Sequence, residues 1–114
     1  MFMNMRLSAL FTATVPLLVA AGPAVNAQVL SPAAQRGLVF VRTNCSQCHS
    51  IDKISDSPLR IAPPFRMLHT KYPIETLRRP LSEGVVVGHP TMPVFRLDPG
   101  QVEDVISYFK TLEN

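Results

Sequence analysis

The chain's only two cysteines lie in the sequence Cys45-Ser46-Gln47-Cys48-His49, a C-x-x-C-H motif. In an exported chain this motif is typical of covalent haem attachment, because two thiols at this spacing can bond to the two vinyl groups on one edge of the ring. The adjacent His49 then becomes the proximal ligand of the iron. The motif therefore predicts one covalently bound haem c, with Cys45, Cys48 and His49 among its binding residues.

The motif also occurs in three other kinds of site. A thioredoxin-like redox pair normally follows a strand in a βαβ pattern, and no such pattern is visible here. A structural zinc site needs four ligands, which Cys45, Cys48, His49 and one remote histidine could supply. A disulfide between Cys45 and Cys48 would be strained and would close a very short loop, so it would add little stability. Haem attachment accounts for the motif best.

Upstream of the motif, the chain begins like a secretory signal peptide. Arg6 supplies the positive charge, the apolar run Leu7–Ala21 follows, and Val25-Asn26-Ala27 offers small residues for cleavage. The apolar run has about 15 residues, short of the roughly 20 that a spanning helix needs. We therefore expect residues 1–27 to be removed, residues 28–114 to form one domain in the periplasm, and no stable membrane insertion afterwards. The alternative is an uncleaved membrane anchor.

The segments flanking the motif predict one helix and one long loop. Ser31-Pro32 is typical of a helix start, because Ser caps free N–H groups and Pro fits the first helical position. We expect this helix to run from Pro32 to about Thr43. Residues 50–72 show little periodicity and several prolines, which indicates mostly loop.

The remainder of the chain predicts two more helical segments. Residues 74–83 have helical spacing, but Pro80 should break or kink the helix near Arg79 and Gly84 should end it. Asp98-Pro99 opens a final helix. Its predicted buried face comprises Val102, Val105, Ile106, Phe109 and Leu112. No β-hairpin signal is present, so we predict an all-α fold of three to five short helices wrapped around the haem.

A second axial ligand of the iron could come from Met67, Met92, His69 or His89. A methionine usually fills gaps in a core. Met92, however, lies in a loop that Pro90 and Pro93 constrain, just before the final helix, and such a loop can hold a thioether toward the iron. We therefore predict His49 and Met92 as the metal ligands, with Met67 as the other methionine and His89 as the bis-histidine alternative.

Along nearly its whole mature length the chain resembles the class I monohaem cytochromes c. The motif preceded by Gly37-Leu38-Val39-Phe40, the segment Ala62-Pro63-Pro64-Phe65, and Gly88–Pro93 followed by Val102–Lys110 carry the resemblance. In this family a Gly and an aromatic residue on the first helix meet the last helix at a close crossing. By the same resemblance, the Pro63 carbonyl would accept the Nδ1 proton of His49 and orient its ring.

The chain also departs from the family pattern. Ala62 stands where Gly is usual, and Pro80 interrupts a helix that is often continuous. Because the chain contains no Trp, the haem propionates need other donors. Arg and Tyr side chains of the central loops are candidates, but the sequence does not select one.

The resemblance and the charge together indicate an electron carrier. Iron ligated by His49 and Met92 has no open site, which argues for one-electron transfer and against an enzyme. The net charge of +3 is too small an excess to indicate nucleic-acid binding. We expect a monomeric periplasmic shuttle that meets donor and acceptor redox proteins. The alternatives are a haem c subunit of a larger dehydrogenase or oxidase complex, and an enzyme or gas-binding protein with five-coordinate iron.

Overall fold

The computed structural model describes residues 15–17, 21–22, 28–84 and 91–113. Most of the expected signal segment 1–27 and the candidate ligand His89 lie outside these residues. The described helices are, in chain order, α1 (Pro32–Asn44), η1 (Phe65–Thr70), η2 (Ile74–Leu77), α2 (Arg78–Glu83) and α3 (Pro99–Lys110). The described ranges contain no strand, which agrees with the all-α prediction, and none of their helices is long and apolar enough to cross a membrane.

Helix α1 begins and ends within a residue of its predicted bounds. The Ser31 hydroxyl accepts a hydrogen bond from the Ala34 N–H at 3.1 Å, and Pro32 occupies the first helical position. Ala34, Gly37 and Val41 form its buried stripe. Because α1 ends at Asn44, the C-x-x-C-H motif starts directly at its carboxyl end.

Residues 50–72 are mostly loop, as predicted, and contain one short helix, η1, that the sequence did not indicate. Phe65 and Leu68, three residues apart, are its buried side chains. This spacing suits a 3₁₀-helix, in which residues i and i+3 lie on the same side. Pro64 directly precedes the helix. A proline at this position prevents the helix from extending toward the N-terminus.

The segment 74–83 is broken close to the position near Arg79 that the sequence predicted. The 3₁₀-helix η2 ends at Leu77 and α2 starts at Arg78, so the change in geometry precedes Pro80. Pro80 then lies in the first turn of α2, where its missing N–H has no helical partner to lose. Gly84 ends α2 in the left-handed conformation with φ of 72°, as expected for a helix stop.

Helix α3 supplies more of the buried hydrophobic residues than any other described helix. Asp98 caps it through the Gln101 N–H at 2.8 Å, and the Gln101 side chain accepts from the Asp98 N–H in return. Its five predicted apolar residues are all buried: Val102, Val105, Ile106, Phe109 and Leu112. The last of these lies beyond the end of the helix at Lys110.

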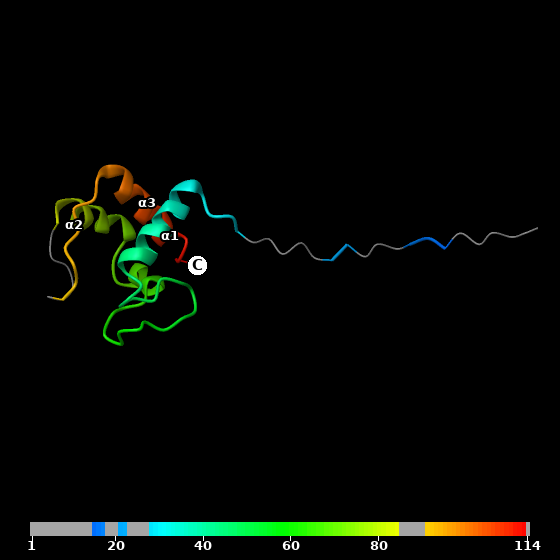
Figure 1. Ribbon diagram of the computed structural model, residues 1–114, viewed down its shortest axis with the longest axis horizontal. Coiled ribbons are helices and arrows are strands. Elements are labelled where there is room, and N and C mark those ends of the chain that lie inside the picture. Colours follow the sequence, from blue (N-terminus) through cyan, green and yellow to red (C-terminus); the bar gives the residue numbers. More distant parts are fainter. Residues whose placement is uncertain (1–14, 18–20, 23–27, 85–90, 114) are drawn as a thin grey trace, which may run out of the picture.

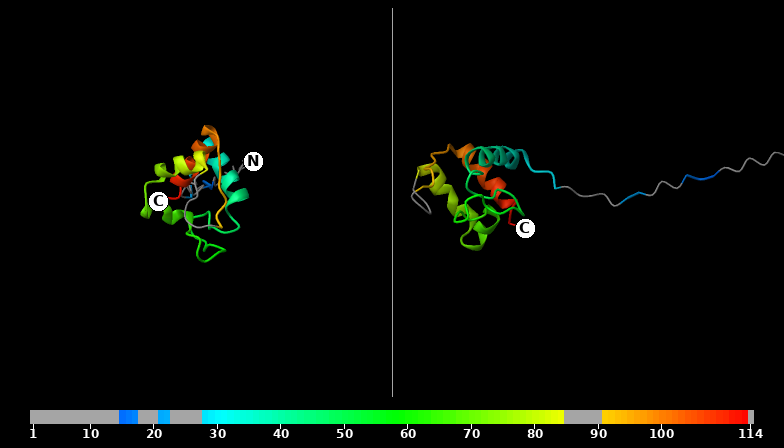
Figure 2. Two further views of the ribbon diagram at one scale, coloured as in Figure 1. Left: turned by 90° about the vertical axis from the view of Figure 1, so that its left-hand side faces the viewer. Right: turned by 60° about the horizontal axis from the view of Figure 1, so that its bottom comes forward.

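Helices α1 and α3 pack against each other at Gly37 (Figures 1 and 2). A Cβ atom at Gly37 would lie 1.9 Å from the Asp104 carbonyl oxygen, so only glycine permits this approach. Beside it, Arg36 forms two hydrogen bonds with the Asp104 carboxylate, at 2.8 and 2.9 Å. The crossing fixes the carboxyl end of α1, and with it the motif, relative to α3.

Gly37→Ala should destabilise the protein, because the added methyl group can be accommodated only if the two helices separate. We expect the free energy of unfolding, measured by urea denaturation, to fall by about 3 kcal/mol. Gly100→Ala is the control, since a Cβ there meets only the Asp98 carboxylate, at 3.2 Å. Equal effects of the two substitutions would contradict the role assigned to the crossing.

Candidate cofactor cavity

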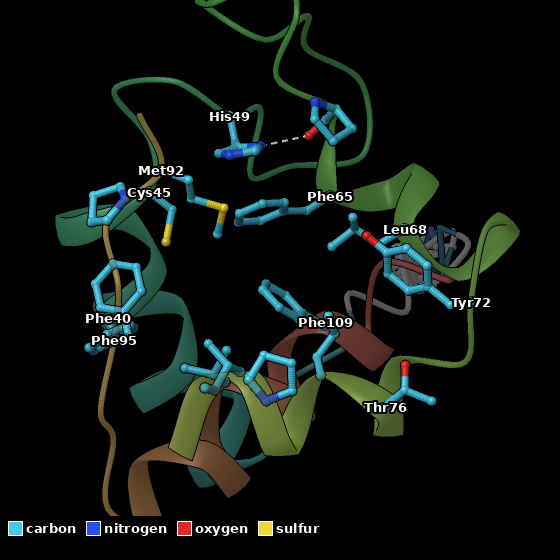
Figure 3. A pocket seen from close by; sticks show the side chains of 16 residues that line it. Phe40, Cys45, His49, Phe65, Leu68, Tyr72, Thr76, Met92, Phe95 and Phe109 are labelled. Atoms are coloured by element: carbon cyan, nitrogen blue, oxygen red, sulfur yellow. Dashed lines mark hydrogen bonds between the residues drawn. The ribbon is translucent and has the colours of Figure 1, made fainter. Parts of the chain in front are cut away.

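A cavity of about 570 Å³ lies between α3 and the motif (Figure 3). Its size falls within the range of small-molecule and cofactor sites. Aliphatic and aromatic side chains and prolines make up most of its wall. They come from α1, η1, η2, α2, α3 and residues 92–95, and include Phe40, Phe65, Leu68, Leu77, Leu81, Phe95, Val105 and Phe109.

His49 is a buried polar side chain on the wall of this cavity, 8% exposed. Its Nδ1 lies 2.8 Å from the carbonyl oxygen of Pro63. A carbonyl can only accept, so Nδ1 must carry the proton, and in the neutral ring Nε2 keeps its lone pair. The contact that the family resemblance implied is thus present, and it leaves Nε2 as the nitrogen that can ligate a metal.

Two aromatic rings support the imidazole. The Phe65 ring stacks on His49 with centroids 4.6 Å apart and planes inclined by 27°. Phe65 in turn meets the ring of Phe109 edge to face, with centroids 4.8 Å apart. The chain His49–Phe65–Phe109 connects the motif through η1 to α3, so the orientation of the imidazole depends on the packed core.

The two cysteines share one turn with His49. The N–H groups of Cys48 and His49 both donate to the Cys45 carbonyl oxygen, at 3.2 and 3.0 Å. Both thiols are free and half-buried, and Cys45 lines the cavity. Burial raises the pKa of the Cys45 thiol to about 11, so this thiol is protonated at neutral pH. The nucleophilic cysteine of a redox pair instead has a lowered pKa, which weakens the thioredoxin-like interpretation.

The three described candidates for the second ligand lie in different places. Met92 lines the cavity together with Cys45 and His49 (Figure 3). Met67 is 46% exposed on η1 and does not line it, and His69 is exposed on the same helix. His89 lies outside the described residues. Three residues after Met92, the Phe95 ring packs edge to face on Phe40 of α1, with centroids 5.8 Å apart.

The groups on the cavity wall that could bind a metal suit a large flat ring with an iron centre. The described residues hold no group of three or more His, Cys, Asp or Glu side chains that could bind a metal without such a ring. A thiol, an imidazole nitrogen and a thioether instead face a mostly apolar space. Such a space excludes water from a haem and leaves its ligands at the wall.

Sequence reasoning missed part of the wall. Leu68, Tyr72 and Thr76 line the cavity, although the first two come from the segment that was expected to be loop. The spacing of Phe65 and Leu68 could have indicated the 3₁₀-helix. No local signal could have placed Tyr72 or Thr76, because their positions depend on how η1 and η2 pack.

Comparison with known proteins gives one match. A family model described as Cytochrome c matches residues 34–113, more than two thirds of the chain. The match begins within α1 and extends past α3, so it includes every residue that lines the cavity. The comparisons with curated proteins and with solved structures returned no match.

Phe65→Ala should lower the free energy of unfolding by about 3 kcal/mol, because it removes a buried ring that contacts both His49 and Phe109. Urea denaturation of the purified protein measures this loss. Met67→Ala is a matched control on the same helix, since its side chain is half exposed. We expect less than about 1 kcal/mol for this control. A small effect of Phe65→Ala would show that the stacked rings do not support the site.

Proposed function

The chain belongs to the cytochrome c family, whose members bind covalently attached haem and transfer electrons, and we propose that this member is an exported one-electron carrier with His/Met-ligated iron. Cys45 and Cys48 would hold the ring through thioether bonds, and His49 and Met92 would be the axial ligands. Pro63 would orient the proximal ligand.

The observation that carries the proposal is the hydrogen bond between His49 and Pro63 at the wall of an apolar cavity. A free surface histidine needs no such partner. Here the bond selects the tautomer with a bare Nε2 and restricts rotation of the ring, and the Phe65 ring covers one of its faces. These are the requirements of an imidazole that must stay on one metal ion.

When bound, the haem supplies the one-electron couple of its iron. The residues of the chain determine how this couple is used. A thioether from Met92 favours ferrous iron more than a second imidazole would and so raises the reduction potential. If His49 and Met92 both held the iron, no coordination position would be left for a substrate. This supports electron transfer rather than catalysis, in keeping with the usual role of the family.

The remaining parts of the proposal concern location and partners. The signal-like residues 1–27 support export and cleavage after Ala27, which would leave Gln28–Asn114 as a diffusible monomer in the periplasm. Such a carrier exchanges electrons with redox proteins in transient contacts, and the small net charge gives no reason to expect nucleic acid.

The periplasmic protein should start at Gln28 and carry the mass of one haem. Intact mass spectrometry of protein from the periplasmic fraction measures both. Cys45→Ser with Cys48→Ser should abolish covalent attachment, because a hydroxyl does not form the thioether. A chain that retains Met1 would refute cleavage, and haem that acidified acetone extracts from the unmodified protein would refute attachment.

Met92→Ala should abolish the weak long-wavelength absorption from sulfur to ferric iron and let the reduced protein bind carbon monoxide at neutral pH. Met67→Ala is the control, and both properties should stay unchanged because this side chain lies outside the cavity. The reverse result would move the ligand to Met67. If neither substitution has an effect, the ligation proposed for Met92 is wrong and His89→Ala is the next variant to measure.

A further inference from the structure

Residues 92–97 carry Met92 along one side of the cavity before α3 begins. They form neither a helix nor a strand. Within the described chain, their backbone is joined to another segment by the hydrogen bond from the Leu97 N–H to the Leu81 carbonyl, at 2.9 Å. This bond lies at the opposite end of the segment from Met92, too far away to fix the thioether by itself. Side chains must therefore hold the segment near Met92.

Phe95 is the aromatic side chain that this segment turns toward the cavity (Figure 3). Its ring meets the Phe40 ring of α1 edge to face, with centroids 5.8 Å apart and planes inclined by 71°. This geometry is favoured, because the positive edge of one ring faces the negative face of the other. The neighbouring Val94 is 48% exposed and does not line the cavity. Phe95 thus joins the segment to α1.

Helix α1 gives Phe40 a fixed backbone. Phe40 lies about one helical turn after Gly37, where the crossing with α3 leaves no room for a Cβ atom. The same helix leads into the C-x-x-C-H motif and His49. One helix therefore supports both proposed axial ligands. It supports His49 through the motif and Met92 through the contact between Phe40 and Phe95.

The Phe40 ring is only partly buried. Besides the cavity, it borders a second hollow of about 350 Å³ between α1 and the first turns of α3, lined also by Val39, Gln101 and Asp104. A ring with empty space beside it is held less firmly than one in a close-packed core. The two rings therefore restrain each other, and removal of either one should free the other.

We propose that Phe40 and Phe95 are a positioning pair that keeps the Met92 thioether on the iron. A methionine side chain has three rotatable bonds, so it keeps a ligand position only if its backbone is held nearby. Pro93 limits the Met92 backbone to extended angles, and the ring contact restrains the segment that follows. The two rings supply no ligand themselves and act through Met92. The inference therefore rests on the proposed ligation by Met92.

Competition for the iron tests the pair in the haem-loaded ferric protein. Imidazole and cyanide bind the iron only while Met92 is off it, so their apparent affinities, titrated optically, report the fraction of unligated iron. Phe95→Ala should raise both affinities by the same factor, about tenfold. Phe40→Ala should do the same, and the double variant should add little, because both changes remove one contact. Phe95→Tyr keeps the ring and should restore the original affinities.

Val94→Ala is the matched control on the same segment, and it should leave both affinities unchanged. Phe95→Leu retains an apolar side chain and serves if the alanine variant does not fold. Its gain should be smaller than that expected for alanine and equal for the two ligands. A gain for the larger imidazole alone would show that the substitution only makes room. That result, unchanged affinities, or an equal gain in Val94→Ala would overturn the inference.

Met92→Ala separates this inference from the proposed function. It should raise both affinities more than any change to the rings does. If it does so while Phe95→Ala has no effect, the two rings are not a positioning pair and the proposed ligation stands. If Met92→Ala changes neither affinity, ligation by Met92 is wrong and the inference falls with it.

Discussion

The close approach of α1 to α3 at Gly37 is the contact on which the rest of the structure depends. The two backbones lie so close at this point that a side chain would not fit. The hydrogen bonds between Arg36 and Asp104 join the two helices beside it. Because Cys45 follows the last residue of α1, this crossing determines where the motif stands relative to Val105 and Phe109. The cavity is the space that results between the end of α1 and the apolar face of α3.

The segment after the motif completes the site through hydrogen bonds rather than helices. Tyr108 of α3 donates to the Ile51 carbonyl, and Arg66 of η1 donates to the Ser55 carbonyl, so the first part of the loop is tied to helical elements. The chain then returns to bring the Pro63 carbonyl to His49. Polar contacts thus fix the direction of the imidazole, while the apolar wall determines what it faces.

Local signals predicted those elements that local chemistry determines. Ser31-Pro32 and Asp98-Pro99 located the starts of α1 and α3, because capping and proline geometry act within one turn. Pro80 likewise indicated a break near Arg79, and the structure has it directly before Arg78. The same reasoning overlooked η1, whose spacing differs from that of an α-helix. The approach of Tyr72 to the cavity could not be predicted, because it depends on packing between segments distant in sequence.

Proton NMR of the reduced, haem-loaded protein with labelled methyl groups tests the central claim most directly. The claim is that the ring fills the cavity between the end of α1 and α3. A haem shifts the resonances of nearby methyl groups strongly through its ring current. The account predicts large shifts for the cavity residues Leu68, Leu81 and Val105, and ordinary positions for the exposed Val39 and Ile54. Ordinary positions for the first three, with large shifts for the exposed pair, would contradict it.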